Sequence, residues 1–495
     1  MNALRKDTLL HYIRDYAQTQ PDKLAVCEMK KTVTYAQYWS NIRKMASLLS
    51  EEGIVRNTHV VIRCFQTIDF LTVFTAVQYM GAFPIPVEQG ISAERILEIS
   101  DAMDGEVLIS DRPMEGIRFV SIRELSKKLE NAKEADYEMP KAEDRSMLLY
   151  TTGTTGDSKG VVIKHINDVS ICENIIGGTG MKKDNVELVP MPLNHAFGMR
   201  RYEANMVNGS TVCLINGVVF IGNVWKLMEL YQVTALGLTP AALNVIFELS
   251  GDTLADYNQQ LDYVQIGAAP LLETDKQKLK ALLPSVRLYD FYGTSECGCI
   301  CILDFNSEDN KPGCVGRLTV NAQVRFTDME GNMIPEVDEE HPGLLALGGP
   351  MVMEGYYRAP EATAEVMENG FVKTRDVAYF DKEGRCVLVG RADDIINFGG
   401  HKISPAEVEN CAADYPGIAE CAYTYRQDPL AGQVPVMLIV KAEGYEEAAF
   451  CRFLADRLES YKIPKAIFET EALPKTFKGT LLRKEIQKMA ESLSD

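Results

Sequence analysis

The chain has 495 residues, of which 46% are hydrophobic and 24% charged, so it is long enough for two or more domains and ordinary in composition for a globular protein. Its formal net charge of −19 argues against nucleic acid as a partner, because binding to a phosphate backbone needs clustered Lys and Arg. The sequence contains no apolar run of the ~18–20 residues that a membrane span requires. The twelve cysteines lack the spacing of a disulfide scaffold, so we expect a cytoplasmic protein without a membrane span.

The first part of the chain predicts a helix followed by a parallel sheet. Residues 1–23 form an amphipathic pattern with charges throughout, which is typical of a helix and not of a signal peptide. Residues 59–87 predict a strand, an apolar helix that ends near Gly81 and a second strand, and residues 105–111 predict a further strand. The polar stretch 127–146 is expected to be a surface connection.

Strands and helices then alternate, and this rhythm predicts parallel sheets covered by helices. From about residue 312, short alternating strands with Gly-rich turns indicate a β-rich subdomain, and a new α/β pattern follows GRADDIINFGG. We therefore expect an α/β fold with a large N-terminal domain, residues 1–392, and a small C-terminal α/β domain, residues 393–495. The large domain would contain two parallel-sheet subdomains and the β-rich subdomain. The strands expected in the alternating part are 186–193, 210–215, 233–240, 261–267 and 286–293.

The segment YTTGTTGDSKG, residues 150–160, follows an apolar strand and has the composition of a phosphate-binding loop. Glycine permits sharp turns and a close approach of backbone N–H groups to an anion. Threonine hydroxyls donate to phosphate oxygens or contact a metal, and lysine adds a positive charge. The segment fits no register of a Walker A loop, and on composition alone a surface turn is the alternative.

Three cysteines alternate in CGCICIL, at Cys297, Cys299 and Cys301. Zinc sites favour two cysteines separated by two to four residues, with a partner pair elsewhere. An alternation with period two favours one face of a buried strand over a metal site.

A series of motifs in a fixed order resembles the ANL superfamily of adenylate-forming enzymes, which includes acyl- and aryl-CoA synthetases, peptide-synthetase adenylation domains and luciferases. The resemblance covers essentially the whole chain and, in combination, the motifs are specific for the superfamily but not for a substrate. They are YTTGTTGDSKG (150–160), PLNHAFG (192–198), IGAAPL (266–271), DFYGTSE (290–296), FVKTRDVAYFDKEGRCVLVGRADDIINFGGHKISPAEVE (371–409), YKIP (461–464) and LPKTFKGTLLRKEI (473–486).

The resemblance implies an AMP-forming acid–CoA ligase that works in two half-reactions. A carboxylate attacks the α-phosphate of ATP and releases pyrophosphate, and the thiol of CoA then displaces AMP from the acyl-adenylate. The first step brings two anions together, so catalysis is mainly positioning and neutralisation of charge. ATP, Mg²⁺ and CoA are the implied cofactor and co-substrates, and a monomer or homodimer is expected.

The same resemblance assigns roles to individual residues. Glu296 with Thr151 would bind Mg²⁺, and Asp376 would accept hydrogen bonds from the ribose. Tyr292 would lie against the adenine, and Asp290 could accept from its amino group. The remaining residues implied in nucleotide or CoA binding are Thr152, Gly153, Thr154, Thr155, Gly156, Lys159, Gly267, Ala268, Ala269, Gly293, Thr294, Arg391, Gly399 and Gly400. His195 is implied at the acyl pocket, with a structural histidine as the alternative, and Asp393 is implied as the hinge of the small domain.

Three positions depart from the family pattern. Ser158 replaces a proline of the phosphate loop, and Arg375 stands where the usual Thr-Gly-Asp has glycine. Thr480 stands where the family has its catalytic lysine. Loss of such a positioned donor typically costs ~10²–10³ in rate. Lys478, two residues away, is expected to replace the missing ammonium in part, because residues i and i+2 of an extended segment share a face.

Two further functions stay open at this point. The protein could load the acyl group onto a carrier-protein phosphopantetheine, or it could be a weak or inactive adenylate-binding homologue because of Thr480. PLNHAFG lacks the aspartate that amino-acid-activating domains place in this region, and the apolar pocket segments suit an aliphatic or aromatic acid. Arg200 and Arg201 could meet a second polar group of the substrate, but exposed helix cations are the favoured interpretation.

Overall fold

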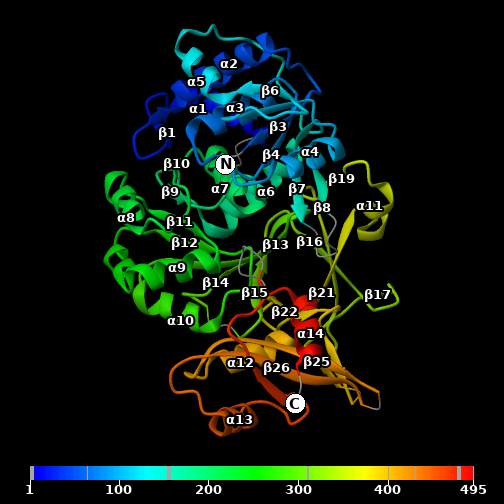
Figure 1. The fold of residues 1–495 in the computed structure, drawn as a ribbon. Helices are drawn as coiled ribbons and strands as arrows, with labels where there is room; N and C mark the ends of the chain where they lie inside the picture. The colour runs from blue at the N-terminus through cyan, green and yellow to red at the C-terminus, as the bar shows by residue number, and fades with distance from the viewer. Residues whose placement is uncertain are drawn as a thin grey trace.

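A computed structural model describes residues 5–63, 65–152, 158–308, 311–399, 401–429, 431–475 and 481–493. The chain runs from the N-terminal part at the top of Figure 1 to a small C-terminal part at the bottom. A search of these residues finds no helix with the length and hydrophobicity that crossing a membrane demands.

The largest sheet has a parallel core with helices on both faces, as predicted. Tyr263 points into one apolar core with α6 (His165–Thr179) and α7 (Ala196–Asn208). Its neighbour Val264 points into another with α8 (Ile221–Leu230), α9 (Pro240–Ser250) and α10 (Glu273–Leu282). The core strands, from the sheet interior to its edge, are β13 (Arg287–Thr294), β12 (Tyr263–Ile266), β11 (Ala235–Leu238), β9 (Val186–Val189), β10 (Thr211–Leu214) and β1 (Leu24–Cys27), with β2 (Thr32–Thr34) antiparallel at the edge.

The predicted β-rich part continues this sheet instead of forming one of its own. β13 pairs antiparallel with the next strand, and the remaining strands follow in one hydrogen-bonded path. The path therefore connects the end of β13 to the strands that carry the 371–391 motif. Its strands are β14 (Gly298–Asp304), β15 (Cys314–Leu318), β22 (Cys386–Arg391), β21 (Phe371–Phe380), β18 (Gly343–Gly348), β16 (Gln323–Thr327) and β17 (Met333–Ile334), with β20 (Met367–Glu368) beside β21.

A second, all-parallel sheet forms the N-terminal subdomain and confirms the prediction for residues 59–111. Its strand order is β4-β3-β5-β6, and every residue of helix α3 except Asp69 is buried. The elements are α1 (Leu9–Thr19), α2 (Tyr35–Glu51), β3 (His59–Arg63), α3 (Ile68–Tyr79), β4 (Phe83–Val87), α4 (Ala93–Ala102), β5 (Val107–Ser110), β6 (Arg118–Ser121), α5 (Ile122–Lys128) and the 3₁₀ turn Leu129–Asn131.

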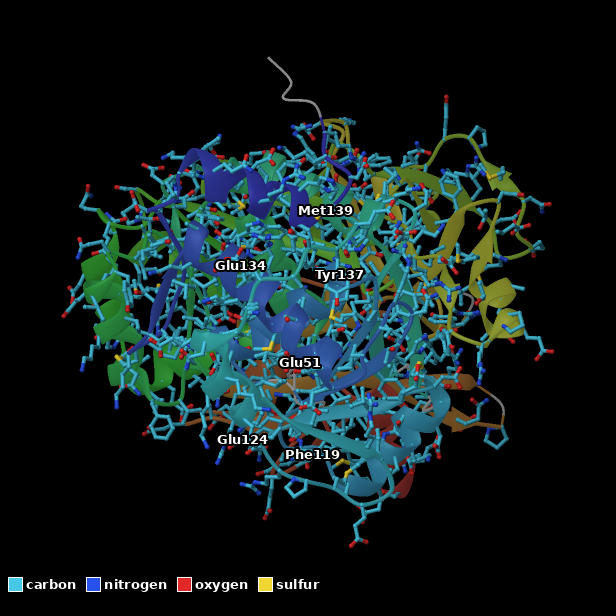
Figure 2. The ribbon with its side chains drawn as sticks, turned by 90° about the horizontal axis from the view of Figure 1, so that it is seen from above. Glu51, Phe119, Glu124, Glu134, Tyr137 and Met139 are labelled. Carbon is cyan, nitrogen blue, oxygen red and sulfur yellow. The ribbon has the colours of Figure 1, made fainter. Side chains whose placement is uncertain are left out.

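The predicted surface connection, residues 127–146, includes a polar strap, residues 132–141, that lies on the outside of α2. Its residues Glu134, Tyr137 and Met139 lie on the face shown in Figure 2. Glu134 accepts a hydrogen bond from Ser40 at 2.5 Å, and the amide of Tyr137 donates to the hydroxyl of Tyr79 at 3.0 Å. These contacts hold the polar strap on the surface without requiring a core of its own.

Two antiparallel strands flank the phosphate-loop segment, and together they are called the phosphate hairpin below. β7 (Arg145–Thr152) pairs with β8 (Ser158–Lys164), and a short strand, β19 (Gly355–Tyr356), adds to the other edge of β8. Helix α11 (Pro360–Val366) follows β19.

The C-terminal part has a five-stranded sheet and apolar clusters of its own. Ile403, Val408 and Phe450 belong to one cluster, and Ile486 and Ala490 to another. Its elements are β23 (Ile396–Phe398), β24 (His401–Ile403), α12 (Pro405–Ala413), β25 (Ile418–Asp428), β26 (Gly432–Lys441), α13 (Glu447–Ala455), β27 (Ala466–Glu469) and α14 (Arg483–Ser492).

Candidate active site

The ribose carboxylate expected from the sequence lies against the end of β13. Tyr292 on β13 donates its hydroxyl hydrogen bond to Oδ2 of Asp376 on β21. On the other side, Nη1 of Arg391 on β22 lies 3.5 Å from Oδ1 of Asp376. Burial raises the pKa of Asp376 above its usual value, and the Tyr292 hydroxyl and the Arg391 charge counteract part of that rise. The structure thus brings three predicted nucleotide residues from three strands together.

The guanidinium of Arg375, next to this carboxylate, points away from it. Its Nε lies 2.7 Å from Oδ2 of Asp393, and its Nη2 contacts Oδ1 of the same residue. The amide of Asp376 donates to the hydroxyl of Thr374 at 3.0 Å. The departure from the family glycine therefore leaves Asp376 unpaired with Arg375 and ties Arg375 to the expected hinge.

Asp290 is buried on the face of the sheet that α10 covers. Its Oδ2 lies 3.2 Å from Nζ of Lys276 on α10, which also pairs with Glu273 at 3.1 Å. Burial raises the pKa of Asp290 to about 6, although Lys276 opposes the rise. The expected contact of Asp290 with adenine stays a prediction, and it would have to compete with this ion pair.

Glu296, the expected metal ligand, lies beside the phosphate hairpin. Its Oε1 accepts a hydrogen bond of 2.8 Å from the hydroxyl of Tyr356 on β19, and its carbonyl accepts one from the amide of Met353 at 2.8 Å. The ring of Tyr356 also faces Lys159 on β8, with Nζ 5.1 Å from the ring centroid. The turn at 292–296 and the part of β8 that carries Lys159 are therefore neighbours, as the family resemblance requires.

The chemistry around Glu296 fits Mg²⁺ held largely by substrate. The described residues contain no group of three or more His, Cys, Asp or Glu side chains that could enclose a metal ion. Mg²⁺ is usually bound through one or two protein oxygens together with phosphates and water, so one carboxylate beside a phosphate loop suffices. The hydroxyl of Thr294 is buried nearby, and within the described chain only the weakly polar thiol of Cys297 offers it a hydrogen bond.

An aromatic wall lies beside the turn after β12. A Cβ on Gly267 would come within 2.0 Å of the Phe291 ring, so only glycine fits there. Phe291 in turn packs on Phe197 with ring centroids 5.0 Å apart. Ala268, the next residue, is exposed and has a positive φ of 69°, and Ala269 follows it in the same turn. His195 precedes α7 at the same end of the sheet, half-buried, and its role at the acyl pocket stays a prediction.

The prediction that Arg200 and Arg201 are exposed helix cations is wrong. Both are buried: Arg201 pairs with Glu187, and Arg200 with Asp168 and, at 2.5 Å, with Glu203. Helix α7 is enclosed on all sides from residue 198 to residue 208, so its charged side chains need partners inside the protein. The three cysteines of β14 and the preceding turn are also buried, as the strand-core interpretation predicts.

Several predicted residues fall where the structure gives no description. Gly153, Thr154, Thr155, Gly156, Gly400, Lys478 and Thr480 lie outside the described residues, and the side chains of Thr151, Thr152 and Ser158 are likewise not described. Gly399 has a positive φ of 60°, a conformation that glycine adopts readily. Gly293 lies close to the facing strand, since a Cβ there would come within 1.9 Å of the Gly298 carbonyl oxygen.

Two site residues were not predicted from the sequence: Lys276, which neutralises Asp290, and Tyr356, which contacts both Glu296 and Lys159. A lysine on a helix after β12 carries no signal of its own. The aromatic pair in GYYRAP could have drawn attention, because it follows directly on the β-rich strands and precedes a helix.

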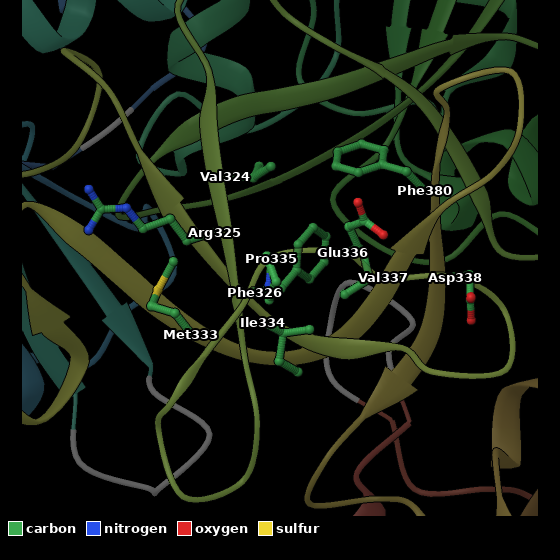
Figure 3. A pocket seen from close by; sticks show the side chains of 10 residues that line it. All are labelled: Val324, Arg325, Phe326, Met333, Ile334, Pro335, Glu336, Val337, Asp338 and Phe380. Carbon is green, nitrogen blue, oxygen red and sulfur yellow. The ribbon is translucent and has the colours of Figure 1, made fainter.

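A separate hollow of about 580 Å³ lies between the β16–β17 hairpin and β21. Figure 3 shows Phe326, Ile334, Val337 and Phe380 around it, with Arg325 directed outward. None of the predicted site residues lines it, so we assign it no part in the reaction.

Comparison with known proteins agrees with this geometry. Residues 13–357 match the AMP-binding enzyme family, and residues 407–480 match the AMP-binding enzyme C-terminal domain. The 2-succinylbenzoate–CoA ligases of Bacillus cereus (strain Q1) and Bacillus mycoides (strain KBAB4) are each 27% identical, over 98% of this chain and 100% of their own.

Solved structures share the fold over nearly the whole chain. ATP-bound MatB from Rhodopseudomonas palustris superposes with a TM-score of 0.88 at 21% identity, covering 98% of this chain and 99% of that one. The o-succinylbenzoate CoA synthetase (MenE) from Bacillus subtilis, in complex with the acyl-adenylate OSB-AMP, gives a TM-score of 0.85 at 23% identity, covering 96% and 97%. The fold and site define an adenylate-forming enzyme. The chain belongs to the AMP-binding enzyme family, which confirms the superfamily and the fold class predicted from the sequence.

Proposed function

We propose that the protein is an ATP-dependent acid–CoA ligase. A carboxylate oxygen of the acid forms a bond to the α-phosphorus of ATP, and the bond to the leaving pyrophosphate breaks. The thiol sulfur of CoA, after loss of its proton, then bonds to the acyl carbon, and AMP leaves with the electron pair of the broken C–O bond. Both steps need charge neutralisation and positioning more than covalent help from the protein.

One observation supports the proposal: five predicted residues from separate segments, four for the nucleotide and one for Mg²⁺, lie in two groups of contacting side chains near the end of β13. Tyr292 and Arg391 contact Asp376, while Glu296 is linked through Tyr356 to Lys159 of the phosphate hairpin. In open α/β sheets the carboxyl ends of the parallel strands are where ligands usually bind.

Each of these residues has a role that its chemistry suits. Asp376 accepts hydrogen bonds from the ribose hydroxyls, and Arg391 holds that carboxylate ionised and oriented. Lys159 contacts the phosphates. Glu296 and the hydroxyl of Thr151 would hold Mg²⁺, which would neutralise phosphate charge.

CoA is the favoured acceptor, because the relatives that this chain matches over their whole length are named CoA ligases. Their named substrate, 2-succinylbenzoate, is aromatic, and the wall of Phe197, Phe291 and Gly267 suits a flat ring. We therefore propose an aromatic carboxylic acid as the substrate, with His195 beside its pocket. A carrier-protein acceptor, the oligomeric state and a cytoplasmic location remain predictions from the sequence.

The small domain is proposed to turn about Asp393 between the two half-reactions. The boundary near residue 393 falls between the two family matches, and the part that follows has apolar clusters of its own. Hinges of this kind are a few residues at the end of an element that absorb a backbone change.

Pyrophosphate release measured with a panel of carboxylic acids tests the proposal. The panel should include 2-succinylbenzoate, benzoate and aliphatic acids, each with CoA, with a holo carrier protein and with neither. We expect acid-dependent release that rises with CoA. Release that requires the carrier protein would support the alternative acceptor, and no release with any acid would contradict a ligase.

A further inference from the structure

Tyr356 contacts both halves of the proposed phosphate site. Its hydroxyl donates to Oε1 of Glu296 at 2.8 Å, and its ring face lies 5.1 Å from Nζ of Lys159. Glu296 follows the end of β13 and Lys159 belongs to β8, so a single side chain connects two segments 137 positions apart in the sequence.

The backbone around Tyr356 is fixed from three directions. β19 pairs antiparallel with β8, where Tyr356 faces Val161. The amide of Tyr356 donates to the hydroxyl of Thr363 at 2.9 Å, and the preceding Met353 amide donates to the carbonyl of Glu296 at 2.8 Å. The phenol is therefore held in place before any ligand arrives, which a residue that orients another side chain needs.

We propose that Tyr356 is a positioning residue with two separable actions; this inference rests on the proposed function. Its hydroxyl occupies one oxygen of Glu296 and so orients the carboxylate toward Mg²⁺ bound on the ATP phosphates. Its ring holds the Lys159 ammonium by a cation–π contact. The hydroxyl therefore affects nucleotide binding only when Mg²⁺ is present, because it acts through Glu296. The ring affects nucleotide binding with or without Mg²⁺, because it acts through Lys159.

Calorimetric binding of ATP, with Mg²⁺ and with EDTA, separates the two actions. Tyr356→Phe keeps the ring and loses the hydroxyl, so we expect MgATP affinity to fall ~10-fold or more, as for partners of metal ligands in general. Binding of ATP in EDTA should change less than twofold. Tyr356→Leu loses both, so affinity should fall with and without Mg²⁺.

Tyr357→Phe is the matched control. The hydroxyl of Tyr357 donates to Asp104 at 2.7 Å, away from Glu296, so its removal should leave both affinities unchanged. Tyr356→Phe that binds MgATP as tightly as the wild type overturns the hydroxyl role, and Tyr356→Leu with unchanged affinity in EDTA overturns the ring role. A wild type that binds no ATP overturns the proposed function as well.

A different observation concerns Arg375, whose backbone has a positive φ of 63° although it is not glycine. Side chains other than Gly, Asn and Asp seldom adopt this conformation. Its Nε and Nη2 donate to the two carboxylate oxygens of Asp393. Its backbone carbonyl accepts a hydrogen bond from the Ala392 amide at 2.8 Å. An unfavourable backbone conformation is thus combined with a bidentate ion pair, the strongest geometry for arginine and carboxylate.

Arg391 connects this ion pair to Asp376, the expected ribose carboxylate. Nη2 of Arg391 lies 3.8 Å from Oδ2 of Asp393, and its Nη1 is the group that reaches Asp376. The side chains of Arg375 and Asp393 are 59% and 47% exposed, so salt should weaken their attraction. We infer that this ion pair is a latch on the proposed hinge, which must open before the small domain can turn about Asp393.

Distance measurements between fluorophores on the two domains test the latch. Dyes on non-natural residues at the exposed positions Val55 and Glu471 report the distribution of domain orientations. Arg375→Asn keeps a residue that tolerates positive φ but removes the ion pair. The domain orientation with the Arg375–Asp393 ion pair formed is in equilibrium with other orientations. We expect its population, relative to theirs, to fall about two- to fivefold in Arg375→Asn. Raising NaCl to about 1 M should do the same in the wild type and have no further effect in the variant.

Arg358→Asn provides the control, because Arg358 also has a positive φ, of 51°, and pairs with Asp104 at 2.6 Å away from the hinge. It should leave the distribution unchanged. A distribution in Arg375→Asn equal to that of the wild type at low salt overturns the latch, and so does a wild-type distribution that salt does not alter.

Discussion

At the scale of single residues, the first half-reaction is predicted to depend on Lys478, because Thr480 stands at the position of the family's catalytic lysine. Threonine at position 480 carries no charge, so we expect Lys478 to supply the ammonium that approaches the α-phosphate. Lys478→Ala should lower carboxylate-dependent ATP–pyrophosphate exchange by ~10²–10³. Lys475→Ala is the control, because Lys475 pairs with Glu420 at 2.6 Å. Unchanged exchange in Lys478→Ala would remove this residue from the mechanism. Exchange that is absent in the wild type and present in Thr480→Lys would show that the native chain is defective in the first half-reaction.

His165, at the start of α6, is expected to set the acid sensitivity of the large domain. Burial lowers its pKa from 6.5 to about 4, and its Nδ1 has no hydrogen-bond partner among the described residues. Below pH 6.5 the imidazole of His165 binds a proton in the unfolded chain but stays neutral in the folded chain. The free energy of unfolding is therefore undiminished above pH 6.5 and decreases as the pH falls toward 4. The loss is ~3 kcal/mol for this group.

Replacing His165 by Phe removes the titration. Denaturant unfolding at pH 7 and pH 4.5 should show a smaller decrease of the unfolding free energy in His165→Phe than in the wild type. His341→Phe, at an exposed turn, should retain the wild-type decrease. Equal pH dependence in His165→Phe and the wild type would show that other groups cause the acid sensitivity.

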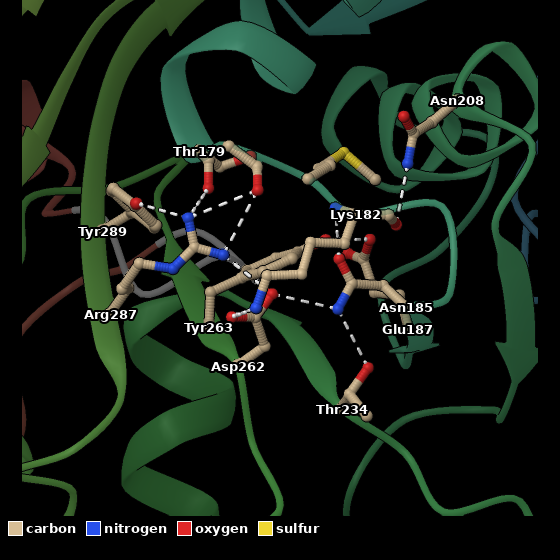
Figure 4. Close-up of polar contacts among 12 residues, drawn as sticks. Thr179, Lys182, Asn185, Glu187, Asn208, Thr234, Asp262, Tyr263, Arg287 and Tyr289 are labelled. Atoms are coloured by element: carbon tan, nitrogen blue, oxygen red, sulfur yellow. Dashed lines mark hydrogen bonds and ion pairs between the residues drawn. The ribbon is translucent and has the colours of Figure 1, made fainter.

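At the scale of elements, a polar clamp holds the amino ends of the parallel strands. Asp262, directly before β12, accepts hydrogen bonds from Lys182 at 2.8 Å, Asn185 at 3.1 Å and Arg287 at 2.7 Å (Figure 4). Burial favours the neutral acid, but these donors outweigh it and hold the pKa of Asp262 below its usual value. The clamp lies at the amino ends of these strands, and the candidate active site follows their carboxyl ends.

Asp262→Ala should therefore reduce stability and spare catalysis. We expect a decrease of ~1–3 kcal/mol in the unfolding free energy at pH 7, because charge-assisted hydrogen bonds are lost. A depressed carboxyl pKa contributes stability that is present above its ordinary value of 3.8 and is lost as the pH falls further, so the variant and wild type should converge in acid. Asp252→Asn, at a side chain that is 75% exposed, should have little effect. A loss of ATP binding in Asp262→Ala without a loss of stability would contradict this assignment.

The elements also show what the sequence could and could not predict. The strands of both parallel sheets were found because such strands are buried on both faces and appear as apolar runs. The pairing of β19 with β8 could not be predicted, because it joins two-residue and seven-residue strands about 190 positions apart. The burial of Arg200 and Arg201 was missed for a similar reason. Their partners lie on α6 and β9, and a charged helix face gives no sign of them.

At the scale of the whole molecule, local motifs indicate candidate site residues, but they do not indicate how distant strands connect. Glycines and carboxylates at a strand end have chemistry that can be recognised locally, as at Asp376 and Glu296. A β-rich subdomain was predicted, but the sequence did not indicate that its strands extend the large sheet. That extension places Asp376 and Arg391 next to Tyr292. Edge pairing across a sheet depends on distant residues, so short-range patterns do not specify it.

The central claim is that MgATP binds where the end of β13, the Asp376 carboxylate and the phosphate hairpin converge. Isothermal calorimetry of MgATP with the wild type and Asp376→Ala tests it most directly, with Asp338→Ala at an exposed turn as the control. We expect saturable heat in the wild type and the control, and an affinity at least ~10-fold weaker in Asp376→Ala, since hydrogen bonds to an ionised group are lost. No heat in the wild type, or equal affinities in all three proteins, would contradict the account.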